Sequence, residues 1–315
     1  MLSNFIFSIN AVIPVFLIML LGYELKRREL LSAGFLASGN KLLFYIALPI
    51  MLFRGVYTND IRDFIDFRFI AFVLGITMAT FFTLWGIASI FIKEKSVVAS
   101  VVQGSFRGNF ALMGIPIILN LAGNAGMARA ALVVVFAIPF FNVLSIMVLA
   151  PCTGEKVGVK SVILAVLKNP SNILIAIGII LTLLNLSLPA ILNVTMNSIA
   201  NLASPLALLC IGGGMVFHGF DAKFKYAAIA SAIKIIVVPI IFTTSAILLG
   251  FRDYDLAVIL VLGGVPTATI SYAMAAQMGG DTSVAGTIIV ITTLASAVTL
   301  TLFIYVMRVL GLLVI

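Results

Sequence analysis

Charged residues, cysteine and histidine are all scarce in this sequence of 315 residues. Only 10% of the residues are charged and 63% are hydrophobic, whereas soluble domains average about 25% charged residues. This composition excludes a soluble domain and favours a protein embedded in a membrane. Cys152 and Cys210 lie in segments of different character, and metal-ligand spacing is absent around them and around the single histidine. We therefore expect no disulfide, no metal site and no cofactor.

Apolar runs long enough to cross a bilayer recur along the whole chain. A hydrocarbon core of about 30 Å needs about 20 helical residues. The runs are continuous rather than alternating, and a helix satisfies its own backbone groups in lipid, so the sequence predicts an all-α integral membrane protein and no β-barrel. It predicts ten transmembrane helices, at residues 5–22, 36–56, 68–92, 97–121, 128–149, 170–187, 193–217, 226–249, 256–278 and 284–311.

The charges of the loops predict how these spans are oriented. Loops after the odd-numbered spans carry ten Lys and Arg residues, and the loops and end on the other side carry six. By the positive-inside rule, the odd-numbered loops face the cytoplasm and both termini are extracytoplasmic. We expect a multi-pass protein of the cell (cytoplasmic) membrane. The net charge is +8, but the basic residues are scattered rather than clustered, so no nucleic-acid partner is expected.

The longest connection, residues 151–169, divides the spans into two sets of five. Spans four and nine share a Gly-x-Pro motif, Gly114-Ile115-Pro116 and Gly264-Val265-Pro266. Glycine suits a helix end and proline removes a helical hydrogen bond, so we predict that both spans are broken. Because five is odd, the set at 170–315 would be inverted relative to the set at 1–150, as in secondary transporters. Alternatively, these residues only kink helices that pack against their neighbours.

Four segments resemble the auxin efflux carrier family, and the match extends over essentially the whole chain. They are SFRGNFALMGIPI, GGVPTATISYAMAAQMGGD, NKLLFYIALPIMLF and IKIIVVPII. That family includes plant auxin exporters and bacterial permeases assigned to malate or malonate. The resemblance implies two inverted five-helix repeats, related to sodium/proton antiporters and bile-acid symporters, in which broken helices 4 and 9 cross. It also implies an elevator-like movement of a transport bundle, spans 3–5 and 8–10, against a scaffold of spans 1, 2, 6 and 7.

The expected function is therefore secondary transport of a small organic anion. The long central cytosolic loop of many plant exporters is absent, so a malate- or malonate-like dicarboxylate is a better expected substrate than an auxin-like one. Motifs of intramembrane enzymes are also absent, and no enzyme activity is expected. The alternative is a non-transporting membrane sensor on the same scaffold. The expected partners are the anion and the lipid bilayer, and a homodimer through the scaffold spans is a further hypothesis.

Polar residues at the predicted breaks form the candidate substrate site. Arg107 lies about eleven residues from either end of its span, where a charge costs at least about 2.5 kcal/mol, and the sequence offers it no buried acid. It either binds a substrate carboxylate or lines a cleft and caps carbonyls freed by the break. Asn109 can donate to a carboxylate and can also cap a half-helix. We expect substrate to be bound by Arg107, Asn109, Gly114, Pro116, Gly264, Pro266, Thr267 and Thr269.

Four further residues are expected to support this site. Hydroxyl groups near a break either bind substrate or satisfy freed backbone groups. Lys234 either pairs with freed carbonyls, in the place of a cation, or binds substrate directly. Because no carboxylate lies in mid-span, where ion-coupled carriers place one, the sequence favours an anion carrier. The supporting residues are Ser105, Lys234, Ser271 and Tyr272.

Overall fold

The computed structural model describes residues 2–58, 66–153, 170–215 and 223–315. The regular elements of these residues are all helices, of which three are π-helices (η). They are α1 (Leu2–Arg27), α2 (Ala33–Leu42), η1 (Leu43–Ala47), α3 (Leu48–Tyr57), α4 (Phe67–Phe91), α5 (Lys95–Phe106), η3 (Phe110–Gly114), α6 (Ile115–Thr153), α8 (Pro170–Leu183), α9 (Ala190–Gly213), α10 (Phe224–Ala232), η4 (Ile233–Val237), α11 (Val238–Leu248), α12 (Asp253–Gly264), α13 (Ile270–Gln277) and α14 (Thr282–Val309).

Within these described residues, seven helical stretches are long and apolar enough to cross a membrane, which confirms an all-helical membrane protein. The number is below ten partly because α8 contains only 14 residues and the ninth predicted span is divided into α12 and α13, with 12 and 8 residues. In addition, the stretch Phe110–Cys152 has 43 residues, roughly 65 Å of helix, which is about twice the thickness of a hydrocarbon core.

This long stretch changes direction within α6. Gly123 has φ 59° and ψ −152°, a conformation that glycine adopts without a steric penalty. After this point, Met127 lies beside Gly55 near the end of α3, whereas Cys152 lies beside Gly279, after α13. The part of α6 after Gly123 therefore crosses the molecule separately, at the boundary predicted between spans four and five.

Two further helices are interrupted in the interior. α5 ends at Phe106 and η3 begins at Phe110, while α12 ends at Gly264 and α13 begins at Ile270. The second break lies at the predicted glycine and proline. The first lies at residues 107–109, so the prediction that the motif ending in Pro116 opens the helix is wrong in position.

Pro116 is accommodated by a wider helical turn instead. Each of the three π-helices is followed directly by a residue and then a proline, namely Pro49, Pro116 and Pro239. The residue before each proline donates its N–H to the carbonyl five residues earlier. Because proline has no N–H and clashes with the carbonyl four residues back, this wider turn lets the helix continue with a bulge.

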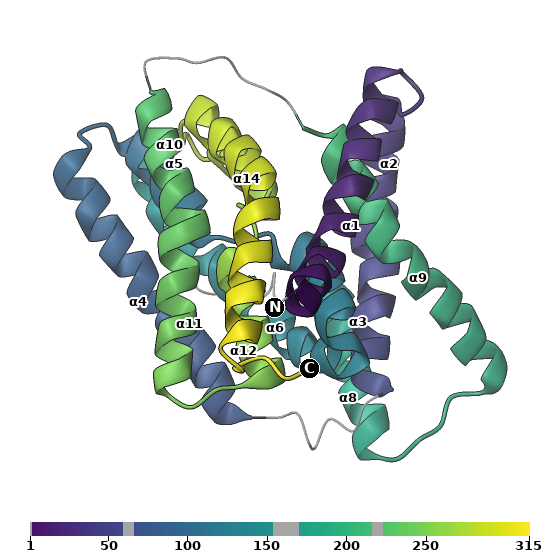
Figure 1. Ribbon diagram of the computed structural model, residues 1–315. Helices are drawn as coiled ribbons and strands as arrows, with labels where there is room; N and C mark the ends of the chain where they lie inside the picture. The colour runs from purple at the N-terminus through teal and green to yellow at the C-terminus, as the bar shows by residue number, and fades with distance from the viewer. Residues whose placement is uncertain (1, 59–65, 154–169, 216–222) are drawn as a thin grey trace.

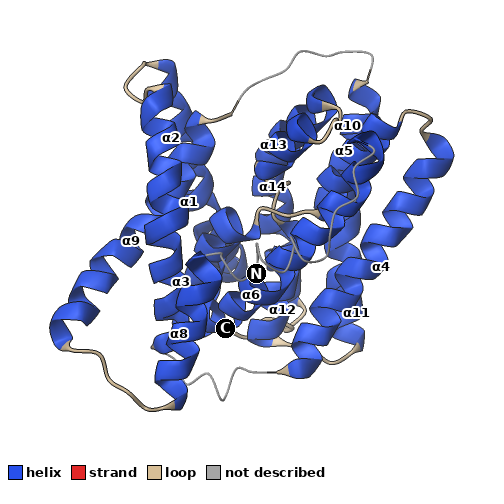
Figure 2. Ribbon diagram, turned by 180° about the vertical axis from the view of Figure 1, so that it is seen from behind, coloured by secondary structure: helices blue, strands red, loops and turns tan. Residues whose placement is uncertain are grey.

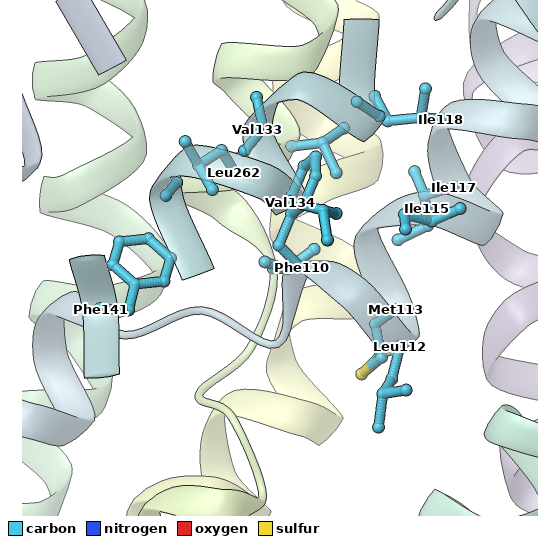
Figure 3. Close-up of a cluster of buried hydrophobic side chains, with 14 of the residues drawn as sticks. Phe110, Leu112, Met113, Ile115, Ile117, Ile118, Val133, Val134, Phe141 and Leu262 are labelled. Carbon is cyan, nitrogen blue, oxygen red and sulfur yellow. The ribbon is translucent and has the colours of Figure 1, made fainter. Parts of the chain in front are cut away.

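The helices form two groups on either side of a shared interior (Figure 1). One group contains α1, α2, α3, α8 and α9, and the other contains α4, α5, α10 and α11, as the view from behind also shows (Figure 2). We call the end with the α1–α2 and α4–α5 turns, uppermost in Figure 1, the upper end, and the opposite end the lower end. Between the groups, buried apolar side chains of η3 and α6 pack with Leu262 of α12 (Figure 3).

Candidate functional site

The backbones of the two helix breaks meet and pair. The N–H of Asn109 donates to the carbonyl of Pro266 at 2.8 Å, and the N–H of Ala268 donates to the carbonyl of Arg107 at 3.1 Å. These two bonds form an isolated antiparallel bridge between Gly108 and Thr267. We call this place the crossing. Its bonds satisfy backbone groups that the interrupted helices leave open, as a buried backbone requires.

Close packing at the crossing requires a glycine at position 108. A Cβ atom there would lie 2.8 Å from Cγ2 of Val265 and 3.1 Å from the carbonyl oxygen of Leu262. Thr267 makes two further hydrogen bonds at the crossing. Its hydroxyl donates to the carbonyl of Gly104 at 2.6 Å, and its N–H donates to Oγ1 of Thr292 at 3.1 Å. The predicted site residue Thr267 therefore has structural partners on α5 and α14.

Arg107 is 4% exposed and finds its partners on neighbouring helices. Its guanidinium donates to Ser145 Oγ at 2.9 Å, to Asn142 Oδ1 at 2.5 Å and to Met274 Sδ at 3.0 Å. Three of its five N–H groups are thus used by neutral acceptors. The sequence reasoning missed Asn142 and Ser145, although two polar residues three apart in an apolar run share one helical face and are a signal of this kind.

Three buried polar atoms near the crossing have no hydrogen-bond partner in the described structure. They are Asn109 Nδ2, Gln103 Oε1 and Ser271 Oγ, on side chains that are at most 6% exposed. The other end of Gln103 donates to Met274 Sδ at 3.5 Å, the atom that also accepts from Arg107. A buried polar group without a partner costs about 1–3 kcal/mol, so these atoms are candidates for contact with a bound polar molecule.

Lys234 is fully buried in η4, and its ammonium donates to the carbonyl of Gly263 at 2.6 Å. This carbonyl belongs to the last turn of α12, where the negative end of the helix dipole attracts a cation. The ammonium also lies 3.3 Å from the position that a Cβ of residue 108 would take. Lys234 therefore places its charge at the crossing while it caps the end of α12. Of the two roles that the sequence suggests for Lys234, this contact is the pairing with a freed carbonyl.

The remaining predicted residues differ in their surroundings. Thr269 and Tyr272 line a cavity of about 200 Å³ between α9, α13 and α14. Ser105 instead donates to the carbonyl of Val101 at 2.7 Å and faces an apolar cavity beside α4 and α10. Glycine and proline residues shape the backbone, since a Cβ at Gly114 or Gly264 would meet Phe110 or Leu300 at about 2.6 or 2.5 Å.

The known proteins that this chain resembles are all described as transporters. The family described as "Membrane transport protein" matches residues 7–304. "Uncharacterized transporter YfdV" of Escherichia coli (strain K12) is 26% identical, covering 96% of this chain and 98% of that protein. "Uncharacterized transporter MJ1031" of Methanocaldococcus jannaschii is 24% identical, covering 93% and 97%. "Putative malonate transporter" of Rhizobium meliloti (strain 1021) is 24% identical, covering 94% and 95%.

Proposed function

Because this chain belongs to the membrane transport protein family of the auxin efflux carriers, we propose that it is a secondary transporter that binds a small organic carboxylate at the crossing. The three partnerless polar atoms around the two interrupted helices carry this proposal. Asn109 Nδ2 and the Ser271 hydroxyl can donate to a carboxylate, and Gln103 Oε1 can accept from a substrate hydroxyl or a water molecule.

The charges near the crossing favour an anion. Arg107 and Lys234 are the buried charged residues in the described part of the chain, and both are basic. In a site of low dielectric, their combined positive potential raises the local concentration of anions. In this proposal Arg107 contributes charge and a remaining N–H group, while Asn142 and Ser145 hold it in place.

We also propose the ten-span arrangement in two inverted repeats. The interrupted helices α5–η3 and α12–α13 belong to the fourth span of each set of five. Gly123 separates spans four and five within α6. α1, α2–α3, α8 and α9 then form the scaffold, and the other helices form a transport bundle that moves past it as an elevator. The connecting loop at 151–169 lies almost entirely outside the described residues, and the extracytoplasmic termini and the scaffold homodimer stay predictions.

A sensor on the same scaffold is the second candidate, but the relatives are transporters by name. The relative with malonate in its name makes malonate the first substrate to test, followed by malate and the auxin indole-3-acetate.

Uptake by purified protein in proteoliposomes tests the proposal. We expect wild type to take up labelled malonate or malate, and Asn109→Ala and Ser271→Ala each to reduce uptake about tenfold, the equivalent of roughly 1.4 kcal/mol. Ser231→Ala is the matched control, because Ser231 donates to the carbonyl of Ala227 within α10 and lies outside the proposed site. A wild type that moves no carboxylate, or site variants that match the control, would refute the proposal.

A further inference from the structure

Two more basic residues lie on one scaffold helix, Arg54 near its lower end and Lys41 in its upper half. Lys41 and Arg54 belong to the helical stretch Ala33–Tyr57, made of α2, η1 and α3. At the rise of a helix, their Cα atoms are roughly 20 Å apart along its axis. Each residue lines a separate cavity between this helix and the segment that follows the first break.

The upper cavity, of about 370 Å³, contains Lys41. Its wall includes Asn40, Leu48 and, from the proposed bundle, Ala111 of η3. Ala111 follows Asn109 by two residues, so this cavity extends from a basic side chain to the edge of the crossing. A carboxylate in the cavity would meet a positive charge before it reaches the break.

The lower cavity, of about 210 Å³, contains Arg54 among amide side chains. Arg54 donates to the carbonyl of Asn193 at 2.9 Å, which uses one of the five N–H groups of the guanidinium. Asn124, Asn197 and Asn201 also line the cavity. A guanidinium group beside several amide groups is chemically suited to a carboxylate, which accepts hydrogen bonds from guanidinium and amide N–H groups.

About one helical turn separates the two cavities. Leu48 lines the upper cavity and Met51 lines the lower one, which places them roughly 5 Å apart along the helix. On the facing segment, the corresponding lining residues are Ala111 and Leu119. The side chains of Met113 and Ile115, which lie between these two in the sequence, are fully buried. We infer that the two cavities are two halves of one path, which these apolar side chains close as a plug.

We propose that Lys41 and Arg54 are two fixed anion-docking residues, one at each end of this path. The inference rests on the proposed function and adds a site on each side of the crossing. Arg107 and Lys234 are buried, whereas Lys41 and Arg54 border cavities that a carboxylate can occupy. A carboxylate docks at one basic residue, crosses the plug with the moving bundle, and docks at the other.

Transport kinetics measured separately at each face of the membrane test the proposal. Vesicles of uniform orientation are selected with a cleavable C-terminal tag, and malonate uptake is measured with substrate presented at either face. We expect Arg54→Gln to raise the half-saturating concentration at least about fivefold at the lower face, with less than a twofold change at the upper face. Lys41→Gln should do the reverse, because each variant removes one local charge.

Matched controls remove a surface charge at the same end without touching a cavity. Lys93→Gln serves the upper end and Arg252→Gln the lower end, where Arg252 donates to local carbonyls; both should keep wild-type kinetics. Arg54→Lys should retain part of the affinity, which separates a charge effect from loss of the bond to Asn193. If wild type transports carboxylate while both Gln variants keep wild-type half-saturation at both faces, or lose it equally at both, this inference fails and the proposed function stands. If wild type transports no carboxylate, both fail.

Discussion

Arg107 brings a full charge into the interior, and its partners are neutral. Asn142 and Ser145 each supply an oxygen acceptor from α6, and Met274 supplies a sulfur from α13. Hydrogen bonds to a charged group are worth more than those between neutral groups, so a few such bonds offset part of the desolvation of the guanidinium. The residue thereby ties α6 and α13 to the break.

Removal of one acceptor tests this view at the scale of the residue. Asn142→Leu keeps the side-chain size but leaves the Arg107 guanidinium without its bond to Oδ1. We expect the free energy of unfolding in detergent to fall by about 1.5–3 kcal/mol. Ser231→Ala, which removes only a hydroxyl bonded within its own helix, should cost less than about 1 kcal/mol. Equal stability of Asn142→Leu and wild type would contradict the assigned role.

A second residue-scale feature lies at the upper end, outside the membrane spans. Lys223 Nζ lies 2.7 Å from carboxylate oxygens of both Glu94 and Asp281. Hydrogen bonding to Asp281, and next to Glu94, raises the pKa of Lys223 above its usual 10.5. The hydrogen bond from Lys223, and next that from Ser96, lowers the pKa of Glu94 below its usual 4.5.

These shifts predict a pH dependence of stability with a defined sign. The contribution of Lys223 is complete below pH 10.5 and is lost as the pH rises through its raised pKa. That of Glu94 is complete above pH 4.5 and is lost as the pH falls through its lowered pKa. We expect the melting temperature of Glu94→Gln to lie slightly below that of wild type at pH 7, with the gap closing in acid. A gap that is constant with pH, or equally present in a Glu29→Gln control, would contradict this.

At the scale of the element, the crossing depends on two interrupted helices whose backbones touch. Gly108 permits this approach, because a Cβ would meet both Val265 and the carbonyl of Leu262. Polar side chains alone would not suffice, since the backbone pair sets where Asn109 lies. The geometry of the site therefore depends on a residue that carries no chemistry of its own.

We expect Gly108→Ala to lower the free energy of unfolding by about 1–3 kcal/mol through overpacking, and to reduce transport as well. Gly86→Ala in α4 is the control, because no heavy atom lies within 4 Å of its added Cβ. In a helix interior that change should be neutral or stabilising by up to about 1 kcal/mol. Thermal unfolding and uptake of the two variants, measured side by side, decide the matter. If Gly108→Ala matched wild type in both measurements, close packing at the crossing would not require a glycine.

At the scale of the whole molecule, an elevator requires the scaffold and the bundle to slide past one another. Gly55 of α3 and Met127 of α6 touch across this proposed interface, with a Cβ at Gly55 lying 3.1 Å from Met127 Cγ. Gly39 of α2 and Cys210 of α9 touch within the scaffold, where the Cβ would lie 3.0 Å from the sulfur. The two pairs are similar in distance but differ in whether the proposed motion separates them.

Disulfides at these pairs should therefore have opposite effects. Oxidation of Gly55→Cys with Met127→Cys, in a background without native cysteines, should abolish transport reversibly. Oxidation of Gly39→Cys with native Cys210, and Cys152 replaced by Ser, should leave most transport intact. Both contacts are close enough for a bridge. Uptake before and after reduction is the measurement, and continued transport by the oxidised first pair would rule out the proposed sliding.

The sequence predicted the apolar stretches well because burial in lipid requires apolar side chains along a whole span, which any local window records. It also located the second break, since Gly264 and Pro266 interrupt α12 directly. The sequence predicts the first break too far along the chain, at Pro116, because a π turn accommodates that proline. Whether a proline breaks a helix or only widens one turn depends on the neighbouring turn.

By itself, the sequence determined a helical membrane protein with two interrupted spans and basic residues in its interior. Only the tertiary structure decided which atoms these residues reach. Arg107 pairs with oxygen atoms 35 and 38 residues away, and Lys234 pairs with a carbonyl 29 residues away. Lys41 and Arg54 border cavities only because α6 packs near their helix. Hydrogen bonds and cavities depend on where distant segments meet, and local composition does not record that meeting.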